Sequence, residues 1–200
     1  MAALLSLFKL RIVGLLVILA VATTTVAAPD GPQLKILALL VVVGTLACAG
    51  ASALNNFIDR DIDAAMRRTR QRVLPRRSMH PGLVLLVGCL FTMLAVILAM
   101  WLSIITAAFV FAGAFIYVVI YTLVLKRRSP LNIVIGGLAG SCAVMAGWTA
   151  VNSSLSLTAI LMAALLFVWT PSSSATRSRL APWGTPSQTM SPGWKTTVCV

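Results

Sequence analysis

Long apolar stretches broken by short polar segments dominate the chain. Single stretches cover about residues 12–28, 36–54, 131–151 and 155–169, and residues 81–125 form a 45-residue run without a charge. A membrane-spanning helix needs about 20 mostly apolar residues, so the 45-residue run predicts two helices with a turn near residues 101–106. The pattern predicts an all-α, polytopic transmembrane bundle of about six helices.

Composition narrows the class of protein further. Hydrophobic residues make up 60% of the 200 residues, charged residues make up 10%, and the mean hydropathy is +0.99. A soluble domain carries about 25% charged residues, and a disordered chain has low hydrophobicity. The lipid bilayer is therefore the expected surrounding of residues 12–169, and a water-soluble globule is excluded.

The basic residues predict the orientation of the bundle. With six spans in series, three basic groups fall on one side: Lys9 with Arg11, residues 60–77, and residues 126–128. Lys35 is the single base expected on the other side. Excess Lys and Arg marks cytoplasmic loops, so these three groups are expected in the cytoplasm. Because the bases lie between apolar segments, no nucleic-acid partner is expected despite the net charge of +12.

The acidic residues are few and clustered. The chain has four Asp and no Glu, and three of them are Asp59, Asp61 and Asp63. If the second span continues as a helix, Asn55, Asp59 and Asp63 stack on one face at a spacing of four residues. Two carboxylates and an amide oxygen form a set of hard oxygen ligands that suits Mg²⁺. The spacing predicts a magnesium site at the cytoplasmic end of this helix.

Arginines follow the acidic cluster directly. Arg67, Arg68, Arg70 and Arg72 lie within nine residues of Asp63. Arg binds phosphate oxygens in a bidentate manner, so the segment could grip a substrate with a charged head and a lipidic tail. The alternative is a solvated loop in which Asp and Arg pair weakly, as at Asp63 and Arg67. That alternative does not explain why the other cytoplasmic segments lack acids.

Part of this segment resembles the first aspartate-rich motif of the UbiA family of intramembrane prenyltransferases. The matching residues are Asn55, Asp59, Asp63, Met66, Arg68, Thr69 and Arg72. Residues 121–137 and the run Trp169-Thr170-Pro171 are similar to the branch of that family that farnesylates haem. The resemblance extends over about residues 4–171.

The resemblance implies an activity and roles for individual residues. Asn55, Asp59 and Asp63 would hold Mg²⁺ on the diphosphate of farnesyl diphosphate, with Arg68, Arg72, Lys126 and Arg127 as further diphosphate contacts. The allylic C–O bond would ionise, and a vinyl group of haem b would attack the shielded cation. Metal and Arg charges stabilise such a leaving group, and a dry pocket keeps water from the cation. Lys126 and Arg127 are equally well explained as topology anchors.

The chain also departs from the family pattern. Family members have about nine helices and a second acidic motif, whereas here the apolar stretches end after six and no acid follows Asp63. From residue 172 on, Ser, Thr and Pro replace the apolar residues. We expect a partial UbiA-like domain over 1–171, and a disordered, non-family tail over 172–200 produced by a frameshift or premature end. Impaired turnover is the corresponding expectation.

Several other functions stay open at this stage. A sister prenyltransferase would use an aromatic or quinone-precursor acceptor, and a non-catalytic membrane fragment would carry the motif without using it. A channel or transporter usually places ionisable groups near the membrane midplane. The acids here lie at a helix end, which favours the prenyltransferase. The expected location is a bacterial or archaeal cell membrane, or the mitochondrial inner membrane.

Overall fold

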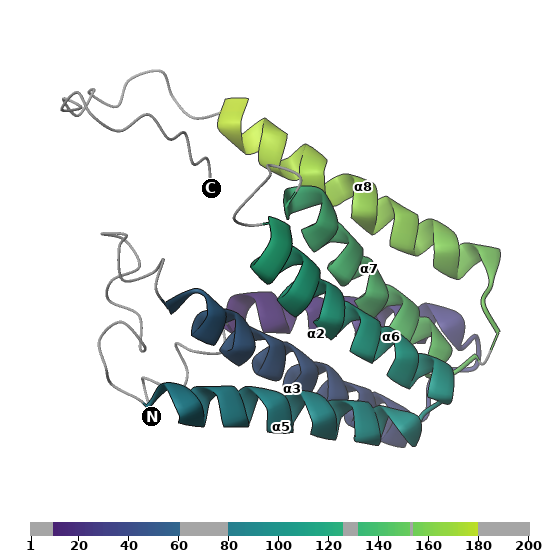
Figure 1. Cartoon of the computed structure of the whole chain (residues 1–200). Helices are drawn as coiled ribbons and strands as arrows, with labels where there is room; N and C mark the ends of the chain where they lie inside the picture. The colour runs from purple at the N-terminus through teal and green to yellow at the C-terminus, as the bar shows by residue number, and fades with distance from the viewer. Residues whose placement is uncertain (1–9, 61–79, 126–131, 153, 180–200) are drawn as a thin grey trace, which may run out of the picture.

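Helices form all the regular structure in the part of the chain that the computed structural model describes, which is residues 10–60, 80–125, 132–152 and 154–179 (Figure 1). Six helical rods follow one another along the sequence. Their bounds are α2 Leu10–Ala27, α3 Leu34–Ile58, α5 Pro81–Met100, α6 Ile104–Phe115 continued by the π-helix η1 Ile116–Leu125, α7 Asn132–Thr149 and α8 Leu157–Arg179. The predicted all-α fold and its six helices are confirmed.

The turn inside the uncharged 45-residue run lies at residues 101–103, within the predicted range. Ser103 ends this turn, and its hydroxyl accepts a 3.2 Å hydrogen bond from the backbone N–H of Ile105. Ser is favoured at this position because its oxygen satisfies an N–H that has no partner in the first helical turn. A polar side chain therefore divides two apolar helices that composition alone does not separate.

The helices cross closely where side chains are small. A Cβ atom added to Gly50 of α3 would lie 2.9 Å from the Gly88 carbonyl oxygen of α5, and one added to Gly147 of α7 would overlap the Ala20 carbonyl of α2. Apolar side chains gain little from leaving lipid, so helix association in a membrane depends on close packing of this kind. α7 packs against α2, α6 and α8, and α3 packs along α5.

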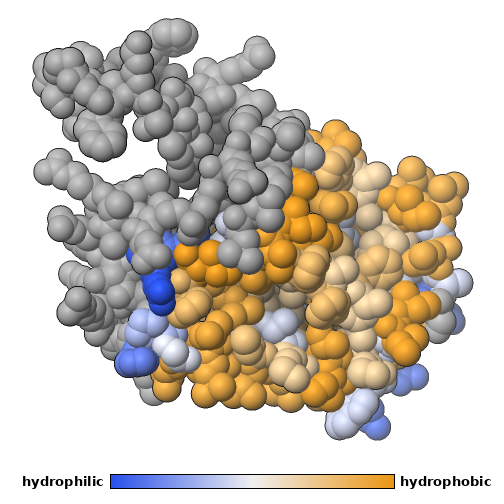
Figure 2. Space-filling model, in the orientation of Figure 1, coloured by the Kyte–Doolittle hydropathy of each residue, from blue (hydrophilic) through white to orange (hydrophobic). Residues whose placement is uncertain are grey.

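The surface of the bundle is apolar over most of the part that Figure 2 draws in colour. Leu86, Ile97 and Leu165 are each more than half exposed on it. Three helices are long and apolar enough to cross a membrane: Leu34–Arg60, Pro81–Met100 and Ile104–Thr122. Three more apolar helices are shorter within the described residues: Ile12–Ala27, Ile135–Thr149 and Leu157–Trp169. The protein is an integral membrane protein.

The expectation of an irregular tail from residue 172 on is wrong for its first part. α8 continues through Pro171 and ends at Arg179. Once an apolar face has packed and nucleated a helix, each further residue that has a backbone N–H adds a hydrogen bond at little extra cost, so a polar sequence can continue it. Residues 180–200 lie outside the described part of the chain, and the boundary at residue 171 stays a prediction.

Candidate functional site

The site begins where α3 ends. Asn55 and Asp59 are one helical turn apart, and both are buried, with 1% and 0% of their surface exposed. The backbone N–H of Asp59 donates a 3.0 Å hydrogen bond to the Asn55 carbonyl, so the helical turn continues to the aspartate. A buried carboxylate is stable only where cations or hydrogen bonds compensate its charge. The two side chains therefore form a polar site inside an apolar bundle.

A second helix fixes the Asn55 side chain. Asn55 Nδ2 donates a 2.8 Å hydrogen bond to Thr122 Oγ1, and the Thr122 hydroxyl donates a 2.8 Å hydrogen bond to the Tyr117 carbonyl. Thr122 is fully buried and lies in η1. This chain of bonds joins the end of α3 to the π-helix at the same end of the bundle.

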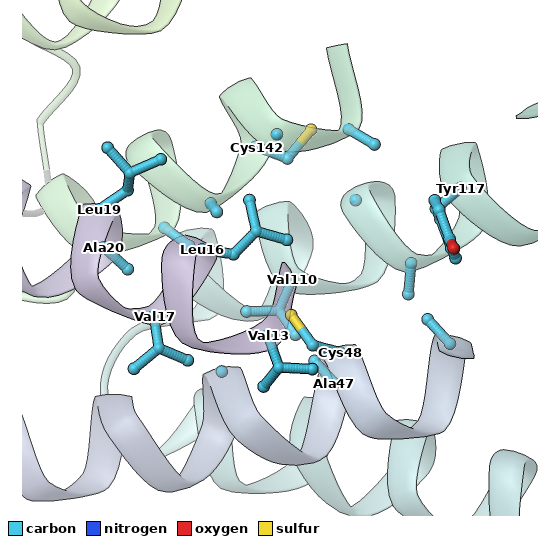
Figure 3. Close-up of a pocket in the computed structure, with 18 of the residues that line it drawn as sticks. Val13, Leu16, Val17, Leu19, Ala20, Ala47, Cys48, Val110, Tyr117 and Cys142 are labelled. Carbon is cyan, nitrogen blue, oxygen red and sulfur yellow. The ribbon is translucent and has the colours of Figure 1, made fainter. Parts of the chain in front are cut away.

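An apolar cavity of about 450 Å³ lies among α2, α3, α6, η1, α7 and α8. Ser52 and Ala51 line it, within one turn of Asn55, and the lining along α3 continues back to Leu40. Figure 3 shows Cys48 of α3 and Cys142 of α7 among the lining side chains, with Val13 and Leu16 of α2. The cysteines thus act as small apolar lining residues, and the cavity could hold an elongated apolar group beneath the polar site.

Two aromatic rings of η1 also line the cavity. The rings of Tyr117 and Tyr121 stack with centroids 5.4 Å apart and planes 8° from parallel. Gly136 of α7 faces this stack, because a Cβ atom there would be in ordinary van der Waals contact with the ring, 3.6 Å from Tyr121 Cε2. Tyr121 therefore belongs to the lining of the cavity.

A base lies directly beside the buried aspartate. Arg60 is exposed, and its guanidinium carbon lies 4.8 Å from the centre of the Phe57 ring. Aromatic faces attract guanidinium groups, so the ring holds a positive charge at the end of α3. The sequence pattern predicted Arg60 only as part of the cytoplasmic basic group, although Phe and Arg three residues apart on a helix were a usable signal for this contact.

The remaining predicted site residues lie outside the described part of the chain. They are Asp63, Arg68, Arg72, Lys126 and Arg127. Within the described residues, no three His, Cys, Asp or Glu side chains gather into a metal site. The structure thus brings together Asn55 and Asp59, two of the three predicted oxygen ligands, and their role as ligands stays a prediction. It adds Thr122, which the sequence did not single out.

Comparison with known proteins places the chain in a family. The model of the UbiA prenyltransferase family matches residues 15–176. Protoheme IX farnesyltransferase 1 of Cenarchaeum symbiosum is 48% identical over 170 residues, which are 82% of this chain and 57% of that protein. Protoheme IX farnesyltransferase of a Nocardioides species is 41% identical over 86% of this chain and 55% of its own length. The chain therefore spans just over half the length of these curated relatives.

A solved structure has the same fold. A UbiA homologue from Archaeoglobus fulgidus, determined bound to DMAPP and Mg²⁺, superposes with a TM-score of 0.72 at 15% sequence identity. The match covers 88% of this chain and 62% of the homologue. The fold, the aspartate motif and the matched sequence agree, and the chain belongs to the UbiA prenyltransferase family.

Proposed function

We propose that this protein transfers a farnesyl group from farnesyl diphosphate to a vinyl group of haem b, with Mg²⁺ as cofactor. The observation that carries the proposal is the buried pair Asn55 and Asp59 at the end of α3, with Asn55 within one turn of Ser52 in the lining of the apolar 450 Å³ cavity. A prenyl diphosphate has the matching shape, with a charged head and an apolar tail. The names of the relatives described above support haem as the acceptor.

The donor set fits a magnesium ion. Mg²⁺ prefers oxygen ligands and commonly shares them between one or two carboxylates and a substrate phosphate. Asp59 would supply a carboxylate and Asn55 an amide oxygen, with Asp63 as a further carboxylate. Bound there, the ion would neutralise charge that develops on the leaving diphosphate. The relative of known structure that binds DMAPP and Mg²⁺ supports this assignment.

Basic side chains would complete the grip on the diphosphate. Arg68, Arg72, Lys126 and Arg127 are the proposed contacts, because charged hydrogen bonds to phosphate oxygens are strong and bidentate for Arg. Arg60 already presents a positive charge at this end of α3. Together these groups would stabilise the pyrophosphate as the allylic C–O bond breaks.

The cavity would hold the prenyl chain and keep it dry. Its lining is almost entirely aliphatic or aromatic, as at Leu16, Val43 and Val110. Exclusion of water protects an allylic cation from hydrolysis. The faces of Tyr117 and Tyr121 would add attraction for that cation.

The proposed reaction breaks the C–O bond of the donor and forms a C–C bond to the acceptor. The C–O bond to the diphosphate breaks, and pyrophosphate leaves with the electron pair. The π electrons of the haem vinyl group form the new C–C bond to the farnesyl carbon. Water then adds to the resulting cation and loses a proton, which gives a hydroxyethylfarnesyl side chain.

The proposed orientation puts the Asp59 end of the bundle in the cytoplasm. In Figure 1 the ends of α3 and η1 and the starts of α5 and α7 lie at one end of the molecule. These are the ends that adjoin the basic segments 61–79 and 126–131. Cytoplasmic loops carry the excess of Lys and Arg, in a bacterial or archaeal cell membrane or in the mitochondrial inner membrane.

The test uses the purified chain in lipid nanodiscs. Retention of labelled farnesyl diphosphate is measured with Mg²⁺ and with EDTA, and products from haem b and from 4-hydroxybenzoate are identified by mass spectrometry. We expect Mg²⁺-dependent retention of farnesyl diphosphate, and farnesylated haem b as the sole product, formed slowly because turnover of this chain is expected to be impaired. Prenylated 4-hydroxybenzoate would show that the acceptor is an aromatic compound. Equal retention of farnesyl diphosphate with Mg²⁺ and with EDTA would overturn the proposed site.

A further inference from the structure

A third group determines which residue donates and which accepts in the hydrogen bond between Asn55 and Thr122. A hydroxyl carries one proton, and the Thr122 proton is used in the 2.8 Å bond to the Tyr117 carbonyl, which can only accept. Thr122 Oγ1 must therefore accept from Asn55, and the amide must turn its nitrogen toward it. Which end of an amide is oxygen is decided by such networks. Here the network decides it through Thr122.

The π-helix brings the two groups of η1 into reach. In an α-helix, residues five apart differ by about 140° around the axis, which would point Thr122 away from the Tyr117 carbonyl. A π-helix closes its turns between residues five apart, so this hydroxyl and this carbonyl lie over one another. Segments of π-helix occur often at functional sites. The unusual backbone of residues 116–125 thus places the Thr122 hydroxyl.

We propose that Thr122 is a positioning residue that fixes the orientation of the Asn55 amide, so that the amide offers its oxygen and not its nitrogen to the divalent cation. The inference rests on the proposed function for the cation and on the hydrogen bonds alone for the orientation. Mg²⁺ binds carbonyl oxygens and is repelled by the positive end of an N–H dipole. A reversed amide would turn one ligand of the site into a repelling group.

The chain offers a matched control in the same helical rod. Thr106 lies in α6, is fully buried, and shares a 3.0 Å hydrogen bond with Thr149 of α7. Thr122→Val and Thr106→Val therefore remove the same hydroxyl from equally buried sites. The Thr106 pair shares no hydrogen bond with Asn55, so a loss that is only structural should appear in both variants.

The first measurement is binding of Mn²⁺, as a probe for Mg²⁺, to the 200-residue chain with inorganic pyrophosphate, followed by electron paramagnetic resonance. Changes in groups that orient metal ligands weaken binding by about 10- to 100-fold, and we expect Thr122→Val to fall in this range. Thr106→Val should bind as the unchanged protein does, and Thr122→Ser should recover most of the affinity. Equal affinity in the two Val variants would overturn the proposal.

The second measurement needs no metal. The chain has four asparagines, so ¹⁵N-asparagine labelling gives few side-chain NH₂ signals, and Asn55→Asp identifies the one from Asn55. We expect this signal to exchange slowly with solvent and to exchange at least about tenfold faster in Thr122→Val, because a hydrogen-bonded proton must be released first. Unchanged exchange would overturn the orienting role. If the Asn55 NH₂ signal exchanged faster in Thr122→Val but the unchanged protein bound no Mn²⁺, the orienting role of Thr122 would stand and the proposed metal function would be overturned.

Discussion

Asn55 Nδ2 lies 2.8 Å from Thr122 Oγ1, a hydrogen bond between residues 67 apart in the sequence. The bond ties the end of α3, where the first aspartate of the motif lies, to the π-helical end of the fourth rod. Because both partners are buried in an apolar bundle, an alternative partner from water is scarce, and losing the bond leaves a polar group unsatisfied. The geometry of the polar site is thus set jointly by two helices.

Removal of the Asp59 charge should abolish metal-dependent donor binding. We expect Asp59→Asn to lower Mg²⁺-dependent retention of farnesyl diphosphate by at least about 100-fold, since losing a ligand exceeds the effect of losing a group that orients one. Asn55→Ala should lower it less. Asn152→Ala is the control, because Asn152, in the loop after α7, also donates a partly buried hydrogen bond, to the Ala27 carbonyl. Comparable losses in Asp59→Asn and Asn152→Ala would contradict the proposed site.

Filling the cavity at a chosen depth should discriminate between donors. Ala47 lines the cavity two helical turns from Asn55, about 12 Å along α3 at 1.5 Å per residue. Ala47→Phe should block a 15-carbon chain while a five-carbon chain, one third as long, still binds. The measurement compares retention of farnesyl and dimethylallyl diphosphate.

Val42→Phe provides the control for the cavity variant. Val42 lies on the same helix with 47% of its surface exposed, so a ring there should leave both affinities unchanged. If Ala47→Phe weakened the two donors equally, the prenyl chain would not follow the cavity along α3.

One glycine should be indispensable for packing. Gly147→Ala places a methyl group against the Ala20 carbonyl, which is backbone and cannot rotate away. Overpacking of this kind lowers the free energy of unfolding by about 1–3 kcal/mol. Gly14→Ala is the matched change, since a Cβ atom there meets nothing within 4 Å. Thermal unfolding in detergent should show a lower Tm for Gly147→Ala alone, and a Tm equal to that of Gly14→Ala would refute the close contact.

Cysteine labelling can establish the orientation. His80 and Asp30 are both exposed and lie at opposite ends of the bundle, one at the start of α5 and the other between α2 and α3. An impermeant maleimide should label His80→Cys from the cytoplasmic face and Asp30→Cys from the other face, in oriented membrane vesicles. The reverse pattern would place the aspartate motif outside the cytoplasm.

Local pattern predicted most of the helices well. An apolar run predicts a membrane helix without knowledge of its neighbours. In lipid, every backbone N–H and C=O must be hydrogen-bonded within the segment itself. The turn at residues 101–103 followed from the length of the uncharged run. The helical continuation past Pro171 was missed because composition there turned polar, while the helix that reaches it was already nucleated upstream.

The sequence by itself determined a membrane bundle and the shared face of Asn55 and Asp59. The bundle follows from the length of the apolar runs, and the shared face from a spacing of four residues in a helix with 3.6 residues per turn. Only the tertiary structure decided that Thr122 meets Asn55, that residues 116–125 adopt a π-helix, and that small residues of α3 and α7 enclose a cavity. These features depend on how separate helices pack, and contacts between residues 67 apart leave no periodic trace in a single sequence.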